Sequence, residues 1–93
     1  MVTEPEVQQR SWTDILPPYR LILHNDDVNS MDHVVFALTD AVPGISIEHA
    51  VEIMLEAHNT GRALVIICPL EQAELYRERL ESYSLTATIE SDR

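Results

Sequence analysis

The residues best suited to chemistry gather at the end of an apolar segment. Residues 21–23 (Leu-Ile-Leu) run through His24 into the polar step Asn25-Asp26-Asp27, and the chain becomes apolar again at Met31. Carboxylates beside an apolar surface can hold a ligand that is cationic at one end and hydrophobic at the other. The first residue of a peptide, with its α-ammonium group and its side chain, is such a ligand. Asn-Asp-Asp is also a common turn composition, because short polar side chains bond their own backbone.

A second candidate residue, His58, lies four residues after Met54 and shares a helical face with it. It is either a core histidine with its hydrogen bonds satisfied, or a neutral imidazole that accepts a hydrogen bond from an ammonium group that Asp26 also holds. Met31 has two interpretations as well. It either fills core space or shapes a pocket with its flexible thioether.

The sequence offers little for catalysis or metal binding. Four histidines and sixteen acids are present, but no His-Glu-x-x-His or paired-cysteine motif occurs. Nucleophile motifs built on Ser, Cys or Lys are missing, as is a glycine-rich phosphate loop. We therefore expect no catalytic residue, no metal, no cofactor and no enzyme activity. A small metal-dependent hydrolase that uses the histidines with Asp26 and Asp27 is the least favoured alternative.

Composition and charge restrict the partners. The 93 residues carry a formal net charge of −10, with six arginines as the only Lys or Arg residues, which argues against a nucleic-acid or anionic-membrane surface. A cationic ligand or a basic partner surface fits this charge better. No apolar segment approaches the roughly 20 residues that span a bilayer. The single Cys68 excludes an intrachain disulfide and favours a buried thiol in a reducing compartment, so we expect a cytoplasmic protein. We also expect a monomer.

Breaks in the pattern divide the chain into an extension and one small α+β domain. Residues 1–18 are predicted as a flexible N-terminal extension that ends at Pro17-Pro18, and residues 19–93 as the folded domain. Strands are expected at residues 19–24, 63–68 and 85–89. The continuous apolar run at 63–68 is typical of a central strand.

Capping residues mark the three expected helices. The first follows Asn29 or Ser30, the second follows Ser46 and ends at Gly61, and the third begins at Pro69. The resulting order is β-α-α-β-α-β. We expect a three-stranded antiparallel sheet covered by three helices.

Two segments together resemble the ClpS family of adaptors. These are Leu-His-Asn-Asp-Asp at 23–27, followed by Met31 and Val34, and Met-Leu-Glu-Ala-His-Asn-Thr-Gly-Arg-Ala at 54–63. The resemblance covers about residues 19–90, and the last part of the chain is similar to photosynthetic-lineage members. It implies a non-catalytic adaptor that delivers proteins with Leu, Phe, Tyr or Trp at the N-terminus to a Clp unfoldase and protease.

The resemblance also implies roles for individual residues. Those expected to bind the α-amino group are Asn25, Asp26 and His58. Those expected at the side-chain pocket are Asp27, Asn29, Met31, Val34, Met54, Ala57 and Leu85, with Met31 as a gate against β-branched residues. Those expected to contact the N-terminal domain of a ClpC-like or ClpA-like unfoldase are Arg62 and Glu71.

Three residues depart from the family pattern. Val28 and Asn29 stand where many members have an aromatic residue and Thr, and Ala57 stands where they have Val. A smaller Ala57 enlarges the expected pocket, and Asn29 adds a polar group to it. The alternative function is a module that docks on a Clp unfoldase or another complex without recognising N-termini.

Overall fold

The computed structural model describes residues 16–92 of the chain. Its elements are, in chain order, β1 (Pro18–His24), α2 (Met31–Ala41), α3 (Ile47–Thr60), β2 (Arg62–Pro69), α4 (Leu70–Ser82) and β3 (Thr86–Ser91). This order is the expected β-α-α-β-α-β, and β1 begins one residue earlier than predicted. Residues 1–15 of the predicted N-terminal extension lie outside the described residues.

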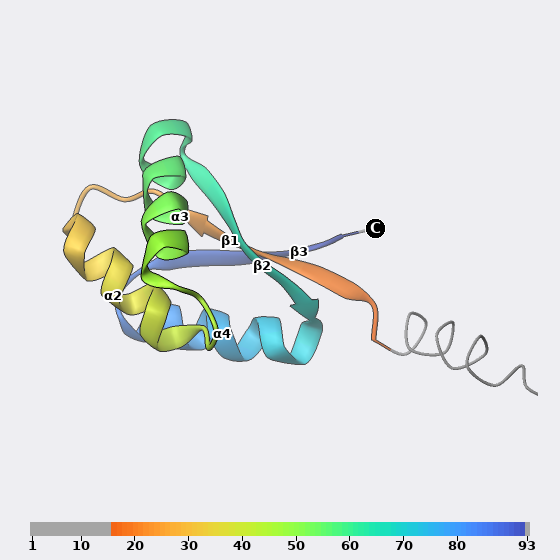
Figure 1. Ribbon diagram of the computed structural model, residues 1–93. Coiled ribbons are helices and arrows are strands. Elements are labelled where there is room, and N and C mark those ends of the chain that lie inside the picture. Colours follow the sequence, from red (N-terminus) through yellow and green to blue (C-terminus); the bar gives the residue numbers. More distant parts are fainter. Residues whose placement is uncertain (1–15, 93) are drawn as a thin grey trace, which may run out of the picture.

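The three strands form an antiparallel sheet in the order β2-β1-β3, and the helices cover one of its faces (Figure 1). The prediction that residues 63–68 form a central strand is therefore wrong, because β2 lies at the edge and β1 in the middle. The apolar run does not require burial on both faces. Leu64 and Ile67 of β2 are 40% and 48% exposed, while Ala63 and Val65 face the core.

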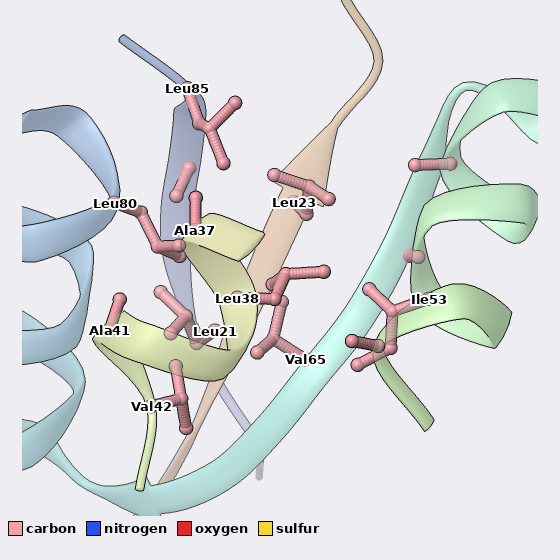
Figure 2. Packing of buried hydrophobic residues seen from close by; sticks show 14 residues of the cluster. Leu21, Leu23, Ala37, Leu38, Ala41, Val42, Ile53, Val65, Leu80 and Leu85 are labelled. Atoms are coloured by element: carbon pink, nitrogen blue, oxygen red, sulfur yellow. The ribbon is translucent and has the colours of Figure 1, made fainter. Parts of the chain in front are cut away.

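The core lies between the sheet and the helices (Figure 2). Leu21 and Leu23 of β1 are 0% and 2% exposed, and they pack with Leu38 of α2, Ile53 of α3 and Leu80 of α4. Ile22 is also buried but does not belong to this cluster, as the alternation of side chains along a strand requires. The core thus fixes β1 along its helix-covered face, so the loop that follows His24 starts from a rigid strand end.

The predicted helix ends are confirmed where side chains cap them. The hydroxyls of Ser30 and Ser46 accept hydrogen bonds from the backbone N–H groups of His33 and His49, at 3.2 and 3.0 Å. Gly61 ends α3 with a left-handed φ of 98°, a conformation that glycine adopts without strain. None of the helices within residues 16–92 has the length and apolar character needed to cross a membrane.

The predicted burial of Cys68 near the end of β2 is confirmed. Its side chain is 7% exposed and forms no disulfide. Burial raises the pKa of the Cys68 thiol, because the thiolate loses hydration in these surroundings. The thiol is therefore poorly suited to act as a nucleophile.

Candidate functional site

The end of β1, the loop after it, the start of α2 and the second half of α3 surround a hollow of about 370 Å³, a volume that includes open solvent at its mouth. Nine of the ten residues predicted from the sequence to bind a peptide N-terminus line it, and Leu23 and His24 complete its lining. The lining residues are Leu23, His24, Asn25, Asp26, Asn29, Met31, Val34, Met54, Ala57, His58 and Leu85.

Asn25 and His58 meet at this hollow because the backbone joins their segments. The Asn25 N–H donates to the Gly61 carbonyl at 3.0 Å, which fixes the loop after β1 to the end of α3. Both side chains are exposed, so the interpretation of His58 as a core histidine is wrong. Within residues 16–92 neither the Asn25 amide nor the His58 ring has a hydrogen-bond partner. Both side chains therefore keep their full capacity for a ligand.

Asp26 organises the loop and also supplies its charge. Its Oδ1 accepts hydrogen bonds from the N–H groups of Val28 and Asn29, both at 2.9 Å, so Asn-Asp-Asp does form a side-chain-closed turn. The backbone hydrogen bond from Asn29 is the main cause that lowers the pKa of Asp26, and the Asn29 side chain and the Val28 N–H add to it. Asp26 is therefore ionised at neutral pH.

The two oxygens of Asp26 differ in how many donors they already have. Oδ1 accepts the two backbone bonds and a contact at 3.2 Å from Asn29 Nδ2, while among residues 16–92 Oδ2 receives only the same Nδ2, at 3.1 Å. A carboxylate oxygen has two lone pairs, so Oδ2 can accept a further donor. The negative charge at the mouth of the hollow thus has one open acceptor position.

Asn29 connects this loop to the opposite wall of the hollow. Its Nδ2 also donates to the Ser84 carbonyl at 2.9 Å, and one residue further on Leu85 lines the hollow. His33 strengthens the connection, because its Nε2 lies 2.7 Å from the Tyr83 carbonyl. A carbonyl only accepts, so Nε2 is the donor. Ser84 is the non-glycine residue within 16–92 with a positive φ, 68°, so these two hydrogen bonds hold a turn that is intrinsically strained.

The apolar part of the hollow consists of buried walls and an exposed rim. Met54, Ala57 and Leu85 are 9%, 3% and 3% exposed, whereas Met31 is 47% exposed. Ala57 offers only a methyl group at the wall, and the unbranched Met31 side chain has several accessible rotamers. The geometry can thus admit a hydrophobic side chain beneath a carboxylate, an amide and an imidazole.

Asp27 is the predicted pocket residue that does not line the hollow. The turn closed by Asp26 leaves Asp27 exposed on its outer side, next to Val28, whose exposure is 90%. His24 was not among the predicted site residues, although it lines the hollow and its Nε2 lies 2.7 Å from Thr88 Oγ1. Because His24 is the last residue of β1, its position beside the acidic loop could have been predicted from the sequence. Its contact with Thr88 of β3 could not.

The two residues predicted to contact an unfoldase lie far apart. Arg62 and Pro69 are the ends of β2, and Glu71 follows two residues later, so a strand length of roughly 23 Å separates them. The Arg62 guanidinium forms an ion pair with Glu90 at 2.5 Å, on a half-exposed surface. Glu71 is exposed and lines a different hollow, between the start of α4 and residues 16–19. The two residues lie at opposite ends of β2, a separation that a standard interface of about 20–30 residues on each side can still span.

The site contains no metal-binding arrangement. Within residues 16–92 no group of three His, Cys, Asp or Glu side chains is placed to hold a metal ion. His24, His33 and His58 instead differ in their surroundings, the first two with hydrogen-bond partners and the last without. The chemistry available at the hollow is the binding of a cationic group and an apolar group at once.

A small α+β domain with an acidic-mouthed apolar pocket is a binding module, and the comparisons with known proteins give its family. The model of the family described as "ATP-dependent Clp protease adaptor protein ClpS" matches residues 15–88. The chain belongs to the ClpS family of Clp protease adaptors.

Similar proteins are found in cyanobacteria and among chloroplastic proteins. The ClpS adapter of Prochlorococcus marinus (strain MIT 9515) is 51% identical over 76 residues, which cover 82% of this chain and 72% of that protein. The ClpS adapter of Synechococcus elongatus is 50% identical over 78 residues, covering 84% and 82%. A chloroplastic Clp protease adapter of Arabidopsis thaliana is 42% identical over 96% of this chain and 56% of that protein. The resemblance to the photosynthetic branch is thereby confirmed.

A solved structure shares the fold. The structure of Agrobacterium tumefaciens ClpS2 bound to L-phenylalaninamide matches with a TM-score of 0.77 and 24% sequence identity, over 82% of this chain and 98% of that chain. The likeness extends over most of the described residues and confirms the predicted α+β architecture.

Proposed function

We propose that the chain is a non-catalytic adaptor that binds proteins through a free N-terminal residue with a large hydrophobic side chain and delivers them to a Clp unfoldase. The observation that carries this proposal is the unused polar capacity at the mouth of an apolar hollow. Asn25, His58 and Oδ2 of Asp26 offer three acceptors, and an α-ammonium group has three N–H donors. The phenylalaninamide in the related A. tumefaciens structure is a ligand of this chemical kind.

The two halves of the hollow contribute comparable free energies. Burying a Leu- or Phe-sized side chain against Met54, Ala57 and Leu85 is worth about 1.5–3 kcal/mol. A charge-assisted hydrogen bond to the Asp26 carboxylate is worth about 1.5–3 kcal/mol more. Neither half alone gives useful affinity, because association itself costs several kcal/mol. The site should therefore refuse an internal residue, an acetylated N-terminus and a small first side chain.

A fluorescence-anisotropy titration with short peptides that differ only at the first residue tests the proposal. Peptides beginning with Leu or Phe should bind, and those beginning with Val or acetyl-Leu should bind at least about tenfold more weakly. Asn25→Ala should lower the affinity for the Leu peptide. Asn59→Ala changes an exposed residue at the same helix end as His58 and should leave this affinity unchanged. Equal binding of Leu and acetyl-Leu peptides would refute recognition of the free N-terminus.

Delivery requires a second surface, and we propose that it includes Glu71. Glu71 lines a hollow with Leu16, Pro17, Tyr19, Leu70 and Glu74, on the part of the domain reached by the opposite end of β1 from the peptide site. A partner bound there would leave the peptide site open. Arg62 is a weaker candidate, because Glu90 already neutralises it. The assignment to a family of Clp protease adaptors supports a Clp unfoldase as the partner, and we propose that it is ClpC-like or ClpA-like and that the adaptor acts as a monomer in the cytoplasm.

The alternative function is docking on a Clp unfoldase without N-terminal recognition, and the hollow beside Glu71 favours it independently of the peptide site. A pulldown with a purified unfoldase N-terminal domain, combined with the peptide titration, separates the two. Glu71→Arg should abolish capture while leaving peptide binding intact if both proposed surfaces operate. Capture together with an absence of peptide binding would favour the docking module.

A further inference from the structure

A second apolar groove runs between α2 and α3 on the surface of the molecule. It encloses about 900 Å³, including open solvent, and its lining is apolar apart from Asp32 and Thr39. The lining residues are Met31, Asp32, Val35, Phe36, Thr39, Ile47, Val51 and Met54. Phe36 on α2 and Ile47 on α3 are 58% and 66% exposed. Large apolar side chains that line one groove and remain exposed to solvent indicate a binding surface.

The groove is continuous with the peptide site. Met31 and Met54 line both hollows, so these two side chains form the wall that the hollows share. Met31 is half exposed at the rim, and methionine adapts to neighbours of different shape. A bound peptide whose first side chain lies against Met31 and Met54 therefore continues either along the groove or into solvent.

The size of the groove favours a tethered occupant over an independent partner. Stable protein interfaces use about 20–30 residues on each side, far more than line this groove. A segment already held at its first residue loses little additional translational freedom when its next side chain binds. Each residue advances an extended chain by about 3.3–3.6 Å, so the second and third residues remain close to the shared methionine wall.

We infer that the α2–α3 groove binds an apolar side chain at the second or third position of the protein whose first residue occupies the pocket. This inference rests on the proposed function, because the first residue supplies the tether. Phe36 and Ile47 provide the two opposite walls that the side chain contacts. The adaptor then reads a short hydrophobic segment, with selection at the first residue and a graded preference at the residues after it.

The test uses three peptides with identical lengths and tails, Leu-Ser-Ser, Leu-Leu-Ser and Leu-Ser-Leu at their first three positions, with acetyl-Leu-Ser-Ser as the blocked reference. Anisotropy titrations of the full chain should show Leu-Leu-Ser or Leu-Ser-Leu binding about 5- to 30-fold more tightly than Leu-Ser-Ser. Phe36→Ser and Ile47→Ser should each remove most of this gain without changing the affinity for Leu-Ser-Ser. Ile47→Ser provides a second probe because Phe36 also has an edge contact with Tyr83, at 5.8 Å between ring centroids.

Leu75→Ser is the matched control, since Leu75 is 43% exposed on α4 and lines neither the groove nor the peptide site. This variant should keep the full gain in affinity for Leu-Leu-Ser or Leu-Ser-Leu over Leu-Ser-Ser. Equal affinities for the three unblocked peptides, with acetylation still abolishing binding, would overturn the inference and leave the proposed function in place. Failure of every peptide to bind would overturn both. Concentration-dependent self-association that Phe36→Ser abolishes would assign the groove to a second copy of the chain and also overturn the inference.

Discussion

Asn29→Ala should weaken peptide binding more than its position beside the pocket alone suggests. The side chain has two N–H groups, and its three contacts correspond to one hydrogen shared by the Asp26 oxygens at 3.1 and 3.2 Å and one donated to the Ser84 carbonyl at 2.9 Å. The first is charge-assisted and worth about 1.5–3 kcal/mol, and the second about 0.5–1.5 kcal/mol. Because Asn29 is only partly buried, water replaces part of these hydrogen bonds in the variant, and we expect a net loss of about 1–2 kcal/mol in binding free energy.

The loss should appear in binding because both contacts position the site. Without Asn29, Oδ2 of Asp26 loses its only donor among the described residues. The strained turn at Ser84 loses its link to the acidic loop and keeps its backbone hydrogen bonds to α4 and the His33 bond to the Tyr83 carbonyl. A loss of 1–2 kcal/mol corresponds to a dissociation constant about 5- to 30-fold higher for a peptide that begins with Leu. Asn29→Asp should be worse than Asn29→Ala, since it removes the donor and sets a second carboxylate beside Asp26.

The assay is anisotropy titration combined with thermal unfolding followed by circular dichroism. Asn59→Ala is the control, because it removes an exposed asparagine amide from the same domain without disturbing these contacts. The expected order of affinity is wild type and Asn59→Ala, then Asn29→Ala, then Asn29→Asp. An unchanged dissociation constant for Asn29→Ala in a folded protein would refute the idea that this bridge positions the site.

Further predictions concern pH and the pocket rim. The pKa of Asp26 is lowered in the folded state. The stabilising contribution of its carboxylate is therefore complete above the ordinary pKa of 3.8 and is lost as the pH falls through the lowered pKa. The difference in unfolding free energy between wild type and Asp26→Asn should shrink on acidification from pH 7 toward pH 3. His58→Ala should weaken binding of a Leu peptide because it removes one of the three acceptors at the mouth of the hollow, and an unchanged dissociation constant would remove His58 from this role. Met31→Ala should raise the affinity for a peptide that begins with Val by about tenfold, since the half-exposed rim side chain excludes the β-branch, and no change would assign the exclusion to the deeper walls.

Local chemistry made much of the fold predictable. Ser30 and Ser46 cap helices through bonds to residues three positions away, and Gly61 ends α3 through its own backbone conformation. Such features depend on neighbours in the sequence, so they can be read from it. The same holds for the turn at Asp26, whose hydrogen-bond donors are two and three residues further along.

Contacts between distant segments could not be predicted in this way. The bonds from Asn29 to Ser84 and from His33 to Tyr83 join residues 55 and 50 positions apart. His33 had no local sequence signal beyond its place on a helix, and its role depends on where the turn before β3 packs. The edge position of β2 was missed for the same reason, because an apolar run specifies buried side chains but not the number of strands beside it.

The structure makes turn formation and the proposed ammonium binding by the acidic loop compatible, although the sequence presented them as alternatives. Asp26 uses Oδ1 to close the turn, and that turn is what places Oδ2 and the Asn25 amide at the mouth of the hollow. A loop held by its own carboxylate needs little reorganisation when a cation arrives, so more of the interaction free energy remains for binding. Asn29 extends this arrangement to Leu85, which makes the ammonium-binding side and the hydrophobic wall one connected unit. A peptide whose first residue fits only the hydrophobic wall leaves the polar groups desolvated and unpaired, and one that fits only the polar groups leaves the apolar hollow empty. Selectivity therefore follows from the connection between the two sides.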